Sequence, residues 1–124
     1  LFAGGSGLVF DSMSDMAQSL EKLASLPEQT KLYCGHEYTL ANLRFAMAVD
    51  PNNQALLDRY RSEQSKRERG MPTLPSTIAL EKATNPFLRV LEPDIVEAIR
   101  THTGLAVSSS SANFKALRNW KNTF

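Results

Sequence analysis

Hydrophobic residues recur along most of this chain at the three- and four-residue intervals that place them on one side of an α-helix. The first such run predicts a helix that begins near Ser12, stops at Pro27 and buries one stripe formed by Met13, Met16, Leu20 and Leu23. Before it, residues 1–3 are apolar and lead into a glycine-rich turn, which indicates a strand followed by a tight loop. After it, residues 31–34 predict a second strand that a glycine closes.

Beyond residue 38 the pattern is helical with short breaks. A helix over residues 39–49 carries one apolar stripe, widened by two further positions, and Asp50 with Pro51 ends it; the apolar residues are Leu40, Leu43, Met47, Phe45 and Val49. Asn52 or Asn53 caps a longer helix that closes at Gly70. Three more helices follow, predicted after a Ser76 cap, from Pro93 to Gly104 with Ile95, Val96 and Ile99 buried, and over residues 114–124.

Length, charge and cysteine content narrow the class of protein. The chain has 124 residues, and 14 Lys and Arg against 13 Asp and Glu leave a net charge of +1, too small a field to attract nucleic acid or a membrane surface. No apolar run approaches the ~20 residues of a membrane-spanning helix. The single cysteine, Cys34, cannot form an internal disulfide, so we expect a reducing cytoplasm. Because "LFAGGSGLVF" resembles neither a natural start nor a signal peptide, we expect a C-terminal fragment of a longer protein.

The stretch "CGHEYT" places His36, Glu37 and Tyr38 at the turn between the second strand and the helix that follows. Strand ends in layered α/β folds gather binding sites, so His36 is a candidate metal ligand, although a lone histidine in such a turn is also commonly structural. One histidine is not a metal site, since a catalytic zinc needs three protein ligands and a two-metal site needs more. Cys34 is expected to be a buried thiol, and His102 is expected to complement a helix C-terminus.

A second candidate is a basic stripe on the last helix. Lys115, Arg118 and Lys121 recur at three-residue intervals, either as a solvated face or as a clamp for a small anionic ligand such as a carboxylate. The charged run "RSEQSKRERG" is interpreted as a solvated helix with local pairs such as Glu63 with Lys66. Three aromatic residues are expected to pack: Tyr33, Tyr60 and Trp120.

Several segments together resemble the C-terminal half of glyoxalase II, also called hydroxyacylglutathione hydrolase, in the metallo-β-lactamase-fold superfamily. They are "LFAGGSG", "YCGHEYTLANLRFA", "DPNN", "PTLPST", "NPFLRV" and "FKALRNWKNTF", and they cover essentially the whole chain in the family's order. The resemblance implies an α+β, mostly helical fold: residues 1–37 would complete a metallo-β-lactamase-like αββα sandwich, and residues 38–124 would form an all-helical glutathione-binding domain.

The resemblance also implies chemistry. The family uses a binuclear metal centre of zinc, iron or manganese to hydrolyse S-D-lactoylglutathione to D-lactate and glutathione, in methylglyoxal detoxification. His36 matches a metal ligand, Tyr38 a contact to the glutathione backbone, and Arg118 with Lys121 the pair that holds the glycine carboxylate. Leu8 replaces a residue that is usually basic, so one substrate contact is absent. We expect a monomer that needs its missing N-terminal half, is inactive alone, and binds neither nucleic acid nor membrane.

Two alternatives stay open. Another hydrolase or a dioxygenase of the same superfamily would share His36, but it would not be expected to keep Tyr38 together with the Arg118 and Lys121 pair. A non-catalytic helical interaction module is the other alternative, because most of the metal ligands would lie outside this chain.

Overall fold

A computed structural model describes residues 13–34, 37–106 and 109–124 of the chain. The strand expected at residues 1–3, the glycine-rich loop, Leu8 and the Ser12 cap lie outside the described residues. Within them the elements are α1 (Met13–Ala24), β1 (Lys31–Leu32), α2 (Thr39–Val49), α3 (Gln54–Glu68), β2 (Ser76–Thr77), α4 (Ile78–Thr84), the 3-10 helix η1 (Pro86–Leu88), α5 (Pro93–Thr103) and α6 (Ser110–Thr123). The described part is therefore mostly helical, as the sequence pattern predicts.

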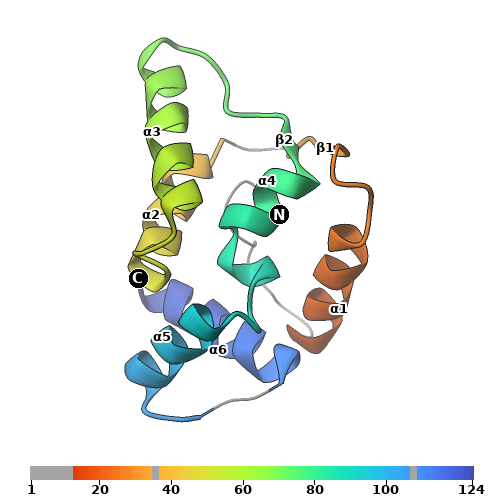
Figure 1. The fold of residues 1–124 in the computed structure, drawn as a ribbon, viewed down its shortest axis with the longest axis vertical. Coiled ribbons are helices and arrows are strands. Elements are labelled where there is room, and N and C mark those ends of the chain that lie inside the picture. The colour runs from red at the N-terminus through yellow and green to blue at the C-terminus, as the bar shows by residue number, and fades with distance from the viewer. Residues whose placement is uncertain (1–12, 35–36, 107–108) are drawn as a thin grey trace.

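The helices surround a short central one. Figure 1 shows α2 and α3 along one side, α1 on the other, α4 between them, and α5 with α6 across one end. Helix α1 packs on α6, η1 and α4, while α5 packs on α6 and α2. In the part of the chain that the structure describes, no helix has the length and apolar character needed to cross a membrane.

Helix α2 lies between two hydrophobic clusters. The larger cluster joins α1, α2, η1, α5 and α6 through Ala17, Leu20, Phe45, Val49, Phe87, Ile95, Ile99, Phe114 and Leu117. The smaller one joins α2 to α3 through Leu43, Ala46 and Leu56, with Met47 and Tyr60 packed against it. Because α2 is apolar on two sides, its predicted single stripe is too narrow a description, although the predicted core positions Leu43, Phe45 and Val49 are all buried.

Helix ends follow local capping rules with one correction. The Asn53 side chain accepts a hydrogen bond from the Leu56 N–H at 3.2 Å and caps α3, as predicted. The predicted Ser76 cap is wrong, because Thr77 accepts from the Leu80 N–H at 3.1 Å and caps α4. Helix α5 ends at Gly104, whose φ of 74° lies in the left-handed region that glycine adopts without strain.

Ser76 is occupied elsewhere, in a buried polar network between α3, β2 and α4. The Arg59 guanidinium lies 3.0 Å from the Glu81 carboxylate, and both side chains are almost fully buried. Ser76 Oγ donates to Glu81 at 2.7 Å, and Asn85 Nδ2 donates to the other carboxylate oxygen at 3.0 Å. Arg59 also donates to Thr84 Oγ1 at 2.7 Å, so the buried charges have several hydrogen-bonding partners.

The charged run on α3 is only partly solvated. Glu63 pairs with Lys66 at 3.3 Å as predicted, but Glu63 is buried, so the interpretation of this run as a solvated face is wrong at that position. The Glu63 side chain lies on the side of α3 that also buries Leu56 and Arg59. Arg59 follows Leu56 by three residues and Glu63 follows Arg59 by four, which places all three on one side of the helix.

The predicted second strand is shorter than expected. β1 pairs antiparallel with β2 in the register Lys31 with Thr77 and Leu32 with Ser76, and pairing stops before residue 33. The expectation that Tyr33 packs in the core is wrong, since its side chain is 75% exposed beyond the end of the pairing. Cys34 is only half-buried, so the expectation of a buried thiol is wrong in degree, although the side chain does contact the larger cluster.

Replacing Glu81 by Gln should lower the free energy of unfolding by about 3 kcal/mol, because the buried Arg59 charge would lose its carboxylate. Urea unfolding followed by circular dichroism measures this effect. Glu97→Gln is the matched control, since Glu97 pairs with Arg100 at 2.5 Å on an exposed face and should leave the midpoint unchanged. Equal midpoints for the two variants would contradict the structural importance of the buried pair.

Candidate functional site

Tyr38 stands at the N-terminal end of α2 with its ring directed to solvent. It is the N-cap residue of α2, makes no side-chain capping hydrogen bond, and is 61% exposed. An exposed phenol at a helix start can offer its hydroxyl and its ring edge to a ligand. His36, the predicted metal ligand, lies outside the described residues.

The first turn of α2 contacts the last turns of α6 through Asn42. The Asn42 N–H donates to the Tyr38 carbonyl at 3.0 Å, as the helix requires, and the Asn42 side-chain oxygen accepts a hydrogen bond from the Lys121 ammonium. Two predicted site residues that are distant in sequence, Tyr38 and Lys121, are therefore connected through one residue, whose backbone bonds the first and whose side chain bonds the second. The structure brings them to the same corner of the molecule.

Arg118 lies deeper than Lys121 on the same helix. It is only 4% exposed, its guanidinium carbon lies 5.8 Å from the centre of the Phe87 ring, and it donates to Asn122 Oδ1 at 2.9 Å. Stacking on Phe87 and the bond to Asn122 fix the plane of the fork. A fixed guanidinium is suited to bidentate binding of a carboxylate.

The two cations are held at an energetic cost. Burial and, to a smaller extent, the nearby positive charge of Arg118 together lower the pKa of Lys121 to about 8. Burial also lowers the pKa of Arg118. Partly desolvated like charges placed together are characteristic of a site that binds an anion, because the anion relieves the repulsion.

Lys115 does not belong to this pair. Its side chain is exposed and lines a hollow of about 400 Å³ with His102 and Trp120, so of the two predicted readings of the basic stripe the solvated face fits Lys115. The sequence analysis missed Asn42, whose position four residues after Tyr38 places it on the same side of the helix. That spacing was the available signal.

The described residues do not form a metal centre by themselves. Among them no three His, Cys, Asp or Glu side chains lie together in a way that could hold an ion. His102 instead stacks on Trp120, with ring centres 4.0 Å apart and planes 8° apart, in the last turn of α5. The part of the chain that the structure covers therefore offers a candidate anion-binding corner, formed by Arg118 and Lys121, and no complete metal site.

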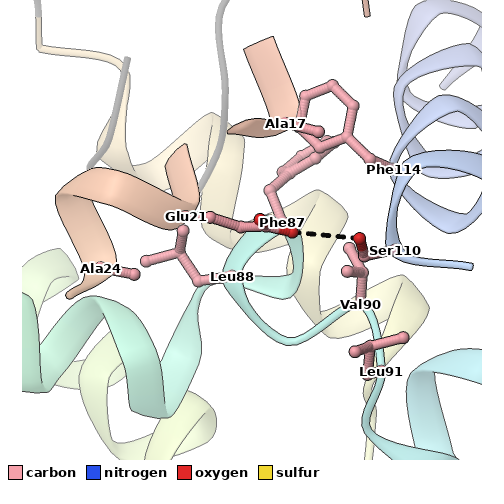
Figure 2. A pocket seen from close by; sticks show the side chains of 9 residues that line it. All are labelled: Ala17, Glu21, Ala24, Phe87, Leu88, Val90, Leu91, Ser110 and Phe114. Atoms are coloured by element: carbon pink, nitrogen blue, oxygen red, sulfur yellow. Dashed lines mark hydrogen bonds between the residues drawn. The ribbon is translucent and has the colours of Figure 1, made fainter. Parts of the chain in front are cut away.

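A separate small pocket lies between α1, η1 and α6. Figure 2 shows its mostly apolar lining, with Phe87 and Phe114 on one side and Leu88 and Ala24 on another. The Ser110 hydroxyl donates to the Glu21 carboxylate at 3.0 Å and joins α6 to α1 across it. Its volume is about 150 Å³, and neither Tyr38 nor Lys121 lines it, so it is not part of the anion-binding corner.

The depressed pKa of Lys121 should make stability depend on pH. The unfolded chain keeps this lysine protonated to about pH 10.4, so between pH 8 and that value the unfolded state binds more protons and the free energy of unfolding rises with pH. Relative to Lys121→Met, the unsubstituted protein should gain about 1–2 kcal/mol from pH 7.5 to 10, since the ammonium keeps part of its hydration. Urea unfolding at both pH values tests this, and a variant with an unchanged pH dependence would contradict it.

Comparison of the sequence with known proteins shows the family to which the chain is related. Residues 37–124 match the family model described as "Hydroxyacylglutathione hydrolase C-terminus". The chain is 47% identical over its whole length to a protein named hydroxyacylglutathione hydrolase from Nitrosomonas europaea, of which it covers 48%. It is 52% identical over 98% of its length to the protein of that name from Alkalilimnicola ehrlichii, again covering 48%.

A third relative of the same name, from Ectopseudomonas mendocina, is 48% identical over the whole chain, which covers 49% of it. The chain thus spans about half the length of the curated relatives it matches. The resemblance inferred from the sequence motifs is confirmed: the chain belongs to the hydroxyacylglutathione hydrolase family, as its C-terminal region.

Proposed function

We propose that this chain provides the glutathione-binding part of a hydroxyacylglutathione hydrolase. The complete protein would convert an S-(2-hydroxyacyl)glutathione, such as S-D-lactoylglutathione, and water into the free hydroxy acid and glutathione. In this hydrolysis the carbonyl carbon gains a bond to the water oxygen, the C–S bond breaks, and a proton returns to the thiolate sulfur. Such a step would serve methylglyoxal detoxification, and the single half-buried thiol Cys34 suits a protein of the cytoplasm.

The observation that carries the proposal is the partly desolvated pair of cations beside Tyr38. Glutathione ends in a glycine carboxylate, and Arg118 with Lys121 offers a planar fork and a point charge to such an anion. Tyr38 would contact the peptide backbone of the same ligand. These residues lie within the stretch that matches the family.

The residues of the chain would act on the substrate mainly by holding it. Arg118 is fixed by Phe87 and Asn122 before any ligand binds, so little side-chain entropy is lost on binding. Lys121 is held by Asn42, and binding of the carboxylate would favour its protonated form. Anchoring the far end of the thioester in this way would orient its reacting carbonyl.

The remaining parts of the proposal concern the complete protein. Residues 1–37 would belong to a metallo-β-lactamase-like sandwich and residues 38–124 to the helical domain, in a monomer completed by an N-terminal half. His36 would join ligands of that half in a binuclear centre of zinc, iron or manganese. When bound, the metals would lower the pKa of water and polarise the thioester carbonyl.

Lys121→Met in the complete protein should raise the KM for S-D-lactoylglutathione about 10- to 100-fold with little change in kcat, because a charge-assisted contact that is made equally in the ground state and the transition state would be lost. Steady-state kinetics measures both constants. Lys115→Met is the matched control on the same helix and should leave KM unchanged, since Lys115 lies on another face. An unaltered KM in the Lys121 variant would contradict the proposed binding of the glycine carboxylate by Lys121.

His36→Ala in the complete protein should lower metal content and turnover together, since residues that do not coordinate the metal cannot replace a lost ligand. Metal analysis by inductively coupled plasma mass spectrometry, alongside thioester hydrolysis, makes the comparison. Unchanged metal stoichiometry would count against the proposed ligand.

A further inference from the structure

The carboxylate of Glu37, just before Tyr38, is bound twice by one distant residue. One oxygen accepts from the Thr73 N–H at 3.3 Å, and the other accepts from the Thr73 hydroxyl. Thr39 Oγ1 lies 2.6 Å from Thr73 Oγ1. Because the Thr73 hydroxyl has one proton and donates it to Glu37, the Thr39 hydroxyl must be the donor to Thr73.

The two threonines are among the most buried polar residues of the described chain. Thr39 is 0% exposed and Thr73 is 2% exposed, whereas Glu37 lies at the surface. The chain of bonds therefore runs from the protein interior to a surface carboxylate, and its last members are charge-assisted. Removing the Thr73 hydroxyl would leave the buried Thr39 hydroxyl without this acceptor.

The segment that contains Thr73 also holds the other end of the same turn. Four residues after Thr73, strand β2 ends its pairing with β1, where Leu32 lies opposite Ser76 and Lys31 opposite Thr77. Residues 73–77 thus bind the chain both before residue 33 and after residue 36. Ser76 is itself held by the buried Glu81 carboxylate, so this support is anchored in the interior.

We propose that Glu37 and Thr73 are positioning residues, which fix the start of α2 so that Tyr38 meets the substrate. The role in substrate binding rests on the function proposed above, while the fixed start of α2 rests on the hydrogen bonds alone. Neither side chain needs to touch the reacting atoms. A loosened helix start would misplace Tyr38, and small misplacements of binding groups cost large factors in rate and affinity.

The test compares four forms of the complete protein: unsubstituted, Thr73→Val, Thr73→Ser and Ile99→Val. Valine keeps the shape of threonine but removes the hydroxyl, and serine restores it. Ile99→Val is a buried control in the larger cluster, away from the turn. The measurements are KM and kcat for S-D-lactoylglutathione.

Thr73→Val should raise KM several-fold with a smaller change in kcat, with serine restoring KM to within twofold and Ile99→Val leaving it unchanged. A rise in KM that serine reverses supports the proposal. Values for Thr73→Val equal to those of Ile99→Val, or a change that serine does not reverse, overturn it. If Thr73→Val does not fold, Glu37→Gln is measured by the same criteria, because its amide nitrogen cannot accept from the Thr73 N–H.

The two proposals fail in different ways. An unsubstituted complete protein without metal or thioester hydrolysis would refute the proposed function before any variant is compared. An active protein in which Thr73→Val behaves as Ile99→Val would refute only the positioning role.

Discussion

The buried pair of Arg59 and Glu81 is the constraint on which the arrangement of the helical domain depends. Two opposite charges with side chains 2% and 0% exposed are tolerable only where each finds several hydrogen-bonding partners, and here those partners come from α4, β2 and the start of η1. These contacts therefore favour one arrangement of the elements, since a shift of any of them would leave a buried charge without its hydrogen-bonding partners. Through Ser76 the pair fixes β2, and through β2 it fixes β1 and the turn that leads to Tyr38.

The candidate site lowers the stability of the folded chain. Arg118 and Lys121 are brought together and partly removed from water, which disfavours the folded chain at neutral pH, as the pKa of about 8 for Lys121 records. A ligand carboxylate would return that free energy on binding. The aromatic cluster of Phe45, Phe87 and Phe114 beneath the cations provides the rigid support for this arrangement.

Local sequence patterns predicted the helices and most of their ends, because apolar periodicity, Asn53 and Gly104 act over a few residues. Where the structure differs from the local pattern, tertiary contacts are the cause. The Ser76 hydroxyl donates to Glu81, five residues away in a buried network, so Thr77 caps α4 in its place. Pairing of β1 stopped too early to bury Tyr33. Arg59 and Glu81 are 22 residues apart, and nothing local distinguishes them from solvated charges.

The binding of an anion by Arg118 and Lys121 stays a prediction, while the contacts around the two residues come from the structure. Each three-residue step turns about 60° around a helix, so Lys115 lies about 120° from Lys121 although it shares the spacing of Arg118 and Lys121. Tyr38 and the two cations were identified by resemblance to a family, whereas Asn42 and Thr73, which connect or support them, became visible only when segments distant in sequence were seen together. Supporting residues of this kind carry no motif of their own.

Helix α2 gives the domain one more property. It contributes Phe45 and Val49 to one hydrophobic cluster and Leu43 and Ala46 to the other. A displacement of α2 would therefore disrupt the packing of both clusters at once. The two clusters are thereby expected to melt as one cooperative unit rather than as separate foldons. Since Tyr38 caps this helix and Asn42 lies in its first turn, local opening of the candidate anion-binding corner is coupled to the packing of both clusters.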